Sequence, residues 1–261
     1  MSTQTISNND DDVIMAPPVS LALRGGALAF GDKTVFENLD LDIPAGQTTA
    51  LLGPSGVGKS CLLRLIAGIS REATARVLAA GDGGPLAGRI AYMDQRDLLL
   101  PWLNVLDNVC LGARLRGETA DHQRALSLLQ RVGLRDEARA LPAALSGGMR
   151  QRAALARTLM EDRAIVLMDE PFSAVDALTR LRLQDLAAEL LGARTILLVT
   201  HDPMEALRLG HRILIMGGDP VTLAPVLEPQ GSPPRPADDP ALYGQAAKIL
   251  ADLANHPDLT G

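Results

Sequence analysis

The stretch GPSGVGKS at residues 53–60 constrains the fold of this chain more than any other. It fits G-x-x-x-x-G-K-[ST] between a strand-like and a helical segment, a setting that favours a phosphate-binding loop over a chance glycine-rich turn. Its glycines let successive backbone N–H groups face an anion at a helix N-terminus. We expect Lys59 to reach the outer phosphates of a nucleotide, and the Ser60 hydroxyl to bind Mg²⁺. The predicted contact residues are Gly53, Pro54, Ser55, Gly56, Val57, Gly58, Lys59, Ser60 and Cys61.

Charge and composition argue against several classes of protein. The 261 residues carry a net charge of −6 and no lysine/arginine block, which argues against a nucleic-acid partner. The longest apolar runs, AIVLM and ILLV, are far shorter than a membrane span. The N-terminus has no lysine, arginine or apolar core, so we expect a disordered acidic tail there and no signal peptide. Cys61 and Cys110 form no CxxC motif, which suits a reducing intracellular compartment and no disulfide.

The order of apolar patterns along the chain predicts an α/β fold. Residues 19–52 alternate and turn like β-structure, whereas helical patterns dominate residues 105–160. Near-continuous apolar runs at 164–170 and 195–202 suit strands of a parallel sheet that is covered on both faces. The chain therefore reads as an α/β domain with a helical insertion in its middle.

Two neighbouring acids end the first of these runs, in AIVLMDEP. Adjacent strand residues point to opposite faces, so both acids cannot enter one core layer, and the carboxyl ends of parallel strands face the ligand crevice. We expect Asp169 to join the Mg²⁺ sphere and Glu170 to act as the base that polarises the attacking water. His201 ends the second run and is expected to contact the γ-phosphate. The alternatives are a solvated strand end and a histidine without a functional role.

A second glycine turn, LSGG at 145–148, opens a strongly helical run. The turn could form another anion-binding helix terminus, with Ser146, Gly147 and Gly148 as its contact residues. Taken alone, however, the turn favours a simple helix cap, because the first loop already supplies a full phosphate cradle.

Considered together, six ordered motifs resemble those of ABC-type ATPases over roughly residues 20–215. They are Gly53–Ser60, Gln95, LSGG at 145–148, Asp169–Glu170, SAVD at 173–176 and His201. The resemblance implies an α/β fold, a P-loop NTPase of ABC type with an N-terminal antiparallel β-subdomain and an inserted α-helical subdomain. It also implies ATP and Mg²⁺ as ligands, with Gln95 joining Ser60 and Asp169 at the metal and Phe30 stacking on adenine.

The same resemblance implies a head-to-tail pair of subunits, either a homodimer or a pair with a second ABC subunit. Ser146 and Gly148 of one subunit would contact the γ-phosphate bound by the other, and SAVD would communicate across the interface. Three positions depart from the commonest family pattern: Met149, Val175 and Cys61. None removes a ligand atom, but they leave the rate open, and Cys61 suggests sensitivity to thiol reagents.

The expected organisation has three parts. They are a tail at 1–18, an ABC ATPase domain at 19–219 with a helical subdomain at about 96–160, and a proline-rich extension at 220–261. Seven prolines between residues 220 and 240 indicate a linker or loose tail, and a short helix is expected at 241–254.

The stretch DQRDLLLPWLNV at 94–105 holds the only tryptophan in the chain. It is either core, with Trp102 buried, or an apolar surface kept for a partner. In the family, residues just after the glutamine that matches Gln95 receive a coupling helix of the permease. RDLLLPWLNVLDNVCLG resembles this region in importers of the nitrate/sulfonate/taurine group, most closely the ATPases for hydroxymethylpyrimidine-type thiamine precursors.

The resemblance thus implies an ATP-hydrolysing subunit that powers an importer of a small organic solute. A hydroxymethylpyrimidine-type thiamine precursor is the first hypothesis for that solute, and a nitrate-, sulfonate- or taurine-type solute is the alternative. The implied partners are permease subunits and, indirectly, a periplasmic or lipid-anchored solute-binding protein. The implied location is peripheral, on the cytoplasmic face of the inner membrane.

Two other classes fit the sequence less well. ABC ATPases of DNA repair carry long coiled coils or basic surfaces, whereas here about 85 residues separate the phosphate loop from LSGG, without heptads. A GTPase switch would need the N-K-x-D motif that recognises guanine, and the sequence lacks this motif. Glu170 argues for turnover, so loss of hydrolysis with ATP binding kept in Glu170→Gln would favour the transport ATPase.

Overall fold

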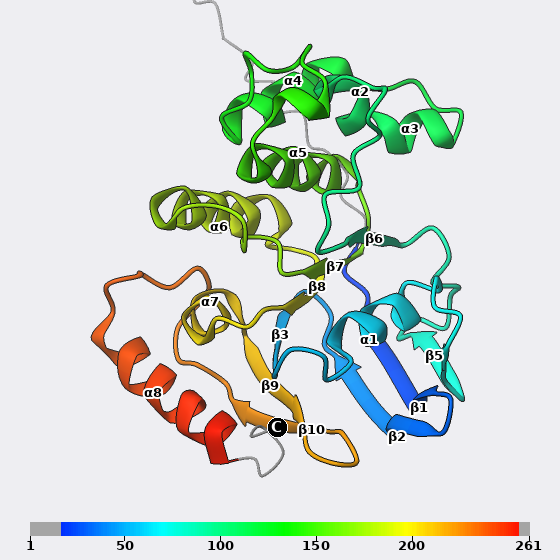
Figure 1. Ribbon diagram of the computed structural model, residues 1–261, viewed down its shortest axis with the longest axis vertical. Coiled ribbons are helices and arrows are strands. Elements are labelled where there is room, and N and C mark those ends of the chain that lie inside the picture. The colour runs from blue at the N-terminus through cyan, green and yellow to red at the C-terminus, as the bar shows by residue number, and fades with distance from the viewer. Residues whose placement is uncertain (1–16, 256–261) are drawn as a thin grey trace, which may run out of the picture.

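A six-stranded sheet organises the molecule, which a computed structural model describes over residues 17–255 (Figure 1). Its order is β10-β9-β3-β8-β7-β6, parallel except for β10, which pairs antiparallel with β9. The strands are β3 (Thr48–Leu52), β6 (Ile90–Met93), β7 (Ile165–Asp169), β8 (Thr195–Val199), β9 (Arg212–Gly217) and β10 (Thr222–Leu227). Every residue of β3, β7 and β8 is buried, as the continuous apolar runs predicted.

A second, antiparallel sheet is formed by the N-terminal residues, with β1 pairing with β2, β4 and β5. Its strands are β1 (Leu21–Phe30), β2 (Lys33–Ile43), β4 (Ala73–Thr74) and β5 (Val77–Ala80). The buried side chains of β2, among them Phe36 and Leu41, pack in one cluster with Leu62 and Ile66 of the helix after the phosphate loop. The predicted antiparallel β-subdomain is thereby confirmed.

Helices α2 to α5 are inserted between β6 and β7 and form the upper part of the molecule in Figure 1. The helices are α1 (Lys59–Ile66), α2 (Val105–Val109), α3 (Leu111–Leu115), α4 (His122–Arg131), the 3₁₀ turn η1 (Pro142–Ala144), α5 (Gly147–Met160), α6 (Ala177–Leu191), α7 (Pro203–Leu209) and α8 (Pro240–Asn255). The inserted α-helical part of the predicted fold class is therefore present.

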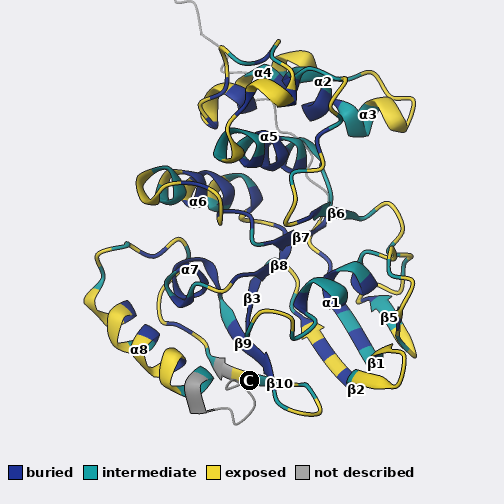
Figure 2. Ribbon diagram, viewed as in Figure 1, coloured by how far each residue is buried: buried dark blue, intermediate teal, exposed yellow. Residues whose placement is uncertain are grey.

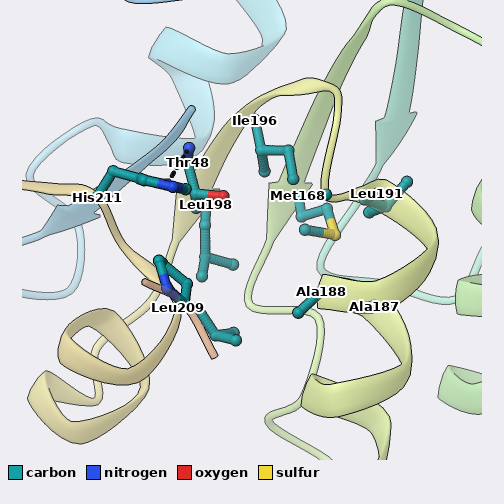
Figure 3. A pocket seen from close by; sticks show the side chains of 11 residues that line it. Thr48, Met168, Ala187, Ala188, Leu191, Ile196, Leu198, Leu209 and His211 are labelled. Atoms are coloured by element: carbon teal, nitrogen blue, oxygen red, sulfur yellow. Dashed lines mark hydrogen bonds between the residues drawn. The ribbon is translucent and has the colours of Figure 1, made fainter. Parts of the chain in front are cut away.

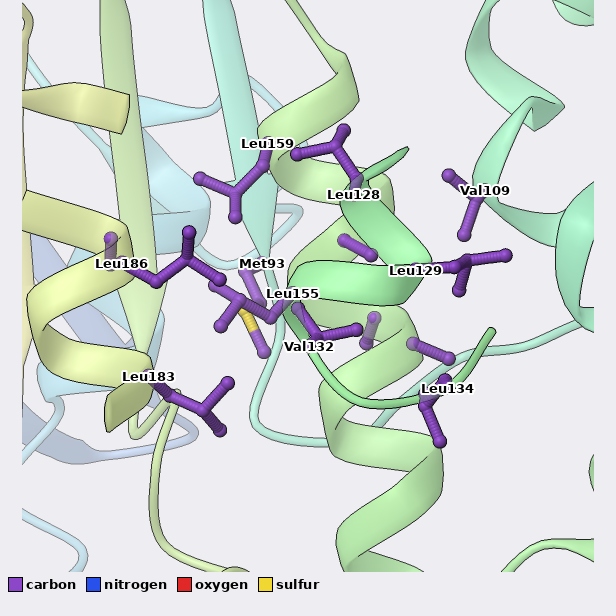
Figure 4. Packing of buried hydrophobic residues seen from close by; sticks show 14 of the residues in the cluster. Met93, Val109, Leu128, Leu129, Val132, Leu134, Leu155, Leu159, Leu183 and Leu186 are labelled. Carbon is purple, nitrogen blue, oxygen red and sulfur yellow. The ribbon is translucent and has the colours of Figure 1, made fainter. Parts of the chain in front are cut away.

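Alternate residues of β7 enter two different cores, since side chains alternate across a strand. Val166 and Met168 join the cluster that includes α4, α5 and α6, whereas Ile165 and Leu167 join the cluster that includes α1 and β2. In the first cluster, Leu155 of α5 lies among side chains of α4, α6 and β6 (Figure 4). The middle of α5 is buried, with Ala153 to Ala156 all in the core (Figure 2). This packing ties the helical insertion to the strand that ends in the two acids.

The expectation of a linker or loose tail at residues 220–240 was wrong. β10 extends the sheet, and Pro225 is tolerated there because β10 is an edge strand. Arg235 is only 3% exposed and donates five hydrogen bonds to backbone carbonyl groups, including those of Leu207 and Gly210. Residues of α8, such as Leu242, then pack in one cluster with α7 and β3. A buried arginine and an edge strand fasten this segment to the domain.

No helix within residues 17–255 is long and apolar enough to cross a membrane. Most of the predicted N-terminal tail, residues 1–16, lies outside the described residues.

Candidate functional site

The phosphate loop leaves β3 and closes over the start of α1. Gly53, Gly56 and Gly58 have φ values of +155°, +82° and +105°, which glycine adopts without a steric penalty. A β-carbon on Gly53 would lie 2.3 Å from the carbonyl oxygen of Met216 on β9, so this position needs glycine for close approach as well. Ser55 and Gly56 are exposed at the tip of the loop. The loop backbone is therefore accessible to an anion.

Lys59 lies beneath this loop and holds it in shape. Its Nζ donates to the carbonyl oxygens of Gly53 and Pro54, each at 2.8 Å. Burial lowers the pKa of Lys59, and the charges of Glu170 and Asp169 oppose that shift. The lysine of the phosphate loop therefore shares one site with Asp169, the last residue of β7, and with Glu170, which follows it.

Asp169 ends β7 and is 1% exposed. Its Oδ2 has no hydrogen-bond partner among the described residues. Burial raises the pKa of Asp169, a hydrogen bond with the Ser60 side chain opposes the rise, and the charges of Asp94 and Glu170 add to it. A buried carboxylate with an unused oxygen beside a hydroxyl fits Mg²⁺, which commonly takes one or two carboxylates together with substrate phosphates. No group of three or more His, Cys, Asp or Glu side chains in the described chain suits a metal held by protein alone.

Glu170 brings the three predicted catalytic residues together. Its Oε2 accepts a hydrogen bond from Gln95 Nε2 at 3.2 Å, and its Oε1 lies 3.3 Å from His201 Nδ1. The backbone of Glu170 has a φ of +48°, a left-handed conformation that is rare for a residue with a β-carbon. Such conformations persist only where the surroundings enforce them, and they concentrate at functional sites. The strand end directs this carboxyl group toward Gln95 and His201.

Gln151 on α5 enforces that turn, and the sequence analysis missed it. Its Nε2 donates to the carbonyl oxygen of Glu170 at 2.9 Å, and its Oε1 accepts from the backbone N–H of Ala174 at 2.7 Å. Gln151 is 6% exposed. The available signal was a glutamine at a buried position of the helix that begins with LSGG.

The loop after Gln95 is fastened to α5 by two arginines. Arg150 Nε donates to Asp97 Oδ2 at 3.0 Å. Arg157 donates to the backbone oxygens of Asp97 and Leu98 at 2.7 and 2.9 Å, and burial lowers its pKa. The position of Gln95 is thus linked to the helix that carries the signature turn.

The LSGG turn caps α5 and remains open on its outer side. Ser146 Oγ accepts from the backbone N–H of Met149 at 3.3 Å, and Ser146 and Gly147 are exposed. A groove of about 450 Å³ is lined by Gln95, Gly147 and Arg150, among others. No hydrogen bond joins this turn to the phosphate loop within residues 17–255. One copy of the chain therefore holds both predicted anion sites without bringing them together.

Two further predicted ligand contacts lie at the margins of the site. Phe30 is 53% exposed at the end of β1 and belongs to none of the buried clusters of the described chain, so its ring has a free face. Cys61 is half-buried, and burial raises the pKa of its thiol. A raised pKa disfavours the thiolate that thiol reagents attack.

Trp102 is 71% exposed, so a core position for it was wrong. Leu98 is 48% exposed, whereas Leu99 between these two positions is buried. Asn108, fully buried on α2, holds the turn: its Oδ1 accepts from the N–H of Leu100, and its Nδ2 donates to three backbone oxygens of residues 100–104. The exposed side chain of Trp102 therefore projects from a turn whose backbone is fixed by hydrogen bonds.

A separate cavity of about 90 Å³ lies between α6, the central sheet and Pro233 (Figure 3). Its apolar wall includes Leu191 and Leu198, and the N–H of Thr48 donates to His211 Nδ1 at 3.0 Å. Burial lowers the pKa of His211. None of the predicted site residues lines this cavity.

Comparisons with known proteins agree with this geometry. A sequence profile described as "ABC transporter" matches residues 36–173. An uncharacterized ABC transporter ATP-binding protein of Haemophilus influenzae is 43% identical over 232 residues, which cover 87% of this chain and 95% of that protein. The aliphatic sulfonates import ATP-binding protein SsuB 1 of Pseudomonas syringae pv. syringae is 43% identical over 239 residues, 91% of this chain and 97% of that one.

Solved structures give the same result. The dimeric post-hydrolysis state of the ATP-binding cassette MJ0796, bound to ADP and Pi, superposes with a TM-score of 0.69 at 28% identity and covers 82% of this chain and 99% of its own. The fold is thus that of a P-loop NTPase of ABC type. Since the profile spans more than half of the residues and the relatives align over most of their length, the chain belongs to the ATP-binding subunits of ABC transporters, ATPases that drive transport.

Proposed function

We propose that this chain is the ATP-hydrolysing subunit of an importer for aliphatic sulfonates or similar small organic anions. The observation that carries the ATPase assignment is the convergence of Gln95 and His201 on Glu170, beside the phosphate loop. The solute class is supported by the names of relatives such as SsuB 1, which align over nearly their whole length. These names favour the sulfonate alternative over a hydroxymethylpyrimidine-type precursor.

In the proposed reaction, Glu170 takes a proton from a water molecule as the water oxygen bonds to the γ-phosphorus of ATP. The bond from that phosphorus to the bridging oxygen breaks, ADP keeps the electron pair, and phosphate is released. Gln95 and His201 orient the water and the γ-phosphate, and Lys59 neutralises charge on the outer phosphates. Ser60, Asp169 and Gln95 would hold Mg²⁺, which draws off the charge that develops on the phosphate oxygens.

The remaining phosphate contacts come from backbone N–H groups of Gly53 to Cys61, and Phe30 stacks on adenine. The exposed signature turn completes the site in trans: Ser146, Gly147 and Gly148 of a second copy contact the γ-phosphate. Their exposure in a single copy and the dimeric state of the MJ0796 cassette support this arrangement. Such a pair is isologous, so one dimer holds two equivalent sites.

The turn that carries Leu98 and Trp102 is the proposed contact with a permease. Exposed apolar side chains on a turn held by buried hydrogen bonds are typical of a docking surface. The subunit would then sit peripherally on the cytoplasmic face of the inner membrane, with a solute-binding protein as an indirect partner.

Glu170→Gln tests the ATPase assignment in the full-length chain. Because the amide cannot accept the proton, we expect kcat for ATP to fall by about 100-fold or more while ATP binding is retained. Phosphate release and binding of a fluorescent ATP analogue measure the two effects. Glu228→Gln, at an exposed position, is the matched control. Unchanged turnover in Glu170→Gln would refute the role of Glu170 as base.

The solute is tested separately, in vesicles that contain the permease that co-purifies with this chain. ATPase stimulation is measured with its binding protein loaded with an alkanesulfonate, with taurine or with a hydroxymethylpyrimidine. We expect the alkanesulfonate to stimulate most. Stimulation by the pyrimidine alone would overturn the proposed solute class and leave the ATPase assignment intact.

A further inference from the structure

A carboxyl group outside the catalytic cluster is buried between α6 and α7. Glu205 is 5% exposed, and its Oε2 accepts from Gln184 Nε2 at 3.2 Å. Its Oε1 has no hydrogen-bond partner of ordinary geometry in the described chain, although the Thr200 side chain lies close enough to lower its pKa. A buried carboxyl group with one unused oxygen is costly, so it calls for an explanation.

The charged groups around Glu205 come from both helices. Gln184 on α6 is 2% exposed and accepts from Arg208 Nη1 of α7 at 2.9 Å. It therefore links the carboxyl group of Glu205 with the guanidinium group of Arg208. Arg208 also pairs with Asp185 of α6. Arg180 of α6 reaches Asp202 at the start of α7, with 3.3 Å between Nη1 and Oδ2. The two helices are therefore joined by a polar network and not by apolar contacts alone.

Both helices begin at functional segments. α6 starts directly after SAVD, with Asp176 as its N-cap. α7 starts two residues after His201, and Asp202 caps it by accepting from the N–H of Glu205 at 3.4 Å. Thr200, just before His201, accepts from the N–H of Asp202 at 3.1 Å. Glu205 thus lies one turn beyond the histidine: its N–H contacts Asp202 on one side, and its carboxyl group lies beside the Thr200 side chain on the other.

The His201 side chain itself is 61% exposed, and within residues 17–255 its close contact with an acid is with Glu170, at 3.3 Å. Packing around the imidazole therefore does little to fix its position. The backbone from Thr200 to Glu205 must do so: the Thr200 N–H donates to the carbonyl oxygen of Leu51 on β3, and the Thr200 side chain accepts from Asp202 and lies beside the Glu205 carboxyl group.

We propose that Glu205, supported by Gln184, is a positioning residue for His201, which it holds in register with the SAVD segment through the link between α6 and α7. The inference rests on the proposed role of His201 at the γ-phosphate. Glu205 touches neither the nucleotide nor the attacking water in this assignment. It acts through the Thr200–His201 backbone.

The charge of Glu205 offers a readout that a purely structural role would not move. Burial raises the pKa of Glu205 to about 7, the charge of Asp202 adds to the rise, and Arg180, Gln184 and Thr200 oppose it. Above that pH the carboxylate accepts a stronger, charge-assisted hydrogen bond from Gln184 and attracts the neighbouring Thr200 hydroxyl group. The link to His201 is then tighter than in the neutral form.

The test compares kcat for ATP hydrolysis between pH 6 and 8.5 in the full-length wild type and in Glu205→Gln. The amide resembles the protonated acid, so we expect equal rates at pH 6 and a rate about threefold or more below wild type at pH 8.5, with KM for ATP unchanged. Glu228→Gln, an exposed change of the same kind, should follow wild type at every pH. If the kcat of Glu205→Gln divided by that of wild type is constant across this pH range, the proposal is overturned.

Two further variants keep the outcome decisive. Gln184→Met removes the donor to Glu205 and should move the inflection in kcat to higher pH; an unmoved inflection counts against the proposal even if Glu205→Gln does not fold. His201→Ala separates the two hypotheses. If its kcat equals wild type, the proposed role of His201 fails. If its kcat falls while the Glu205→Gln ratio stays constant, only the positioning role fails.

Discussion

The end of β7 and the start of α5 carry the two halves of the proposed ATP site, and the chain fixes them to very different degrees. Asp169 is almost fully buried, and Glu170 is held in a left-handed backbone conformation by Gln151. Ser146, in contrast, is exposed, and in the described part of the chain it bonds only within its own turn. In the proposed arrangement, one copy completes the hydrolytic half, whereas its signature turn contacts a nucleotide only when a second copy is present.

The largest expected effect comes from separating these halves. Lys59→Ala removes the phosphate contact of a subunit, and Ser146→Arg blocks its signature turn. We expect each variant alone to lose about 100-fold or more in ATPase rate, because each disables both sites of a homodimer. A mixed dimer, however, keeps one site built from the intact halves.

Mixing the two variants in equal amounts should therefore restore about a quarter of the wild-type rate, since half of the dimers are mixed and each has one intact site. Phosphate release is measured before and after subunits exchange. Lys59→Ala mixed with Glu170→Gln is the control, because both changes lie in the same half and no intact pairing results. Absence of recovery in the first mixture would contradict the division of the site between two copies.

The structure brings together the residues that the sequence predicted for the hydrolytic half, because their motifs are local. A phosphate loop between a strand and a helix, and acids at the end of a buried strand, fix their own positions once the parallel sheet forms. The supporting residues were missed because they act over distance. Gln151 bonds to Glu170 and Ala174 from another helix, and nothing in its own neighbourhood in the sequence reveals those partners.

The C-terminal segment and Trp102 show two other limits of sequence reasoning. Prolines indicated a loose segment, yet Arg235 finds its carbonyl partners on α7, far away in the chain. For Trp102, hydrophobicity could not decide between burial and exposure, because apolar side chains occur both in cores and on docking surfaces. Exposure was decided by Asn108, whose hydrogen bonds set the turn.

The docking surface gives the next largest effect. Trp102→Ser should weaken association with the permease by about tenfold or more, because buried aromatic side chains dominate interface energies. The ATPase rate and melting temperature of the isolated subunit should stay close to wild type, since the side chain is exposed. Leu250→Ser, at an exposed position of α8, is the matched control. Equal pull-down of permease by both variants would argue against this surface.

The smallest expected effect lies at the margin of the hydrolytic half, at Phe30. Stacking between two aromatic rings contributes about 0.5–1.5 kcal/mol beyond buried area, and we take this as the minimum for Phe30 on adenine. Phe30→Ala should therefore raise KM for ATP by roughly three- to tenfold and leave kcat unchanged, because the ring meets the base and not the reacting phosphate. Phe30→Tyr keeps the ring and should behave like wild type. If Phe30→Ala instead lowers kcat at constant KM, the residue supports the fold of the loop and adenine binds elsewhere. The part of the ATP site that one copy provides would then not include Phe30.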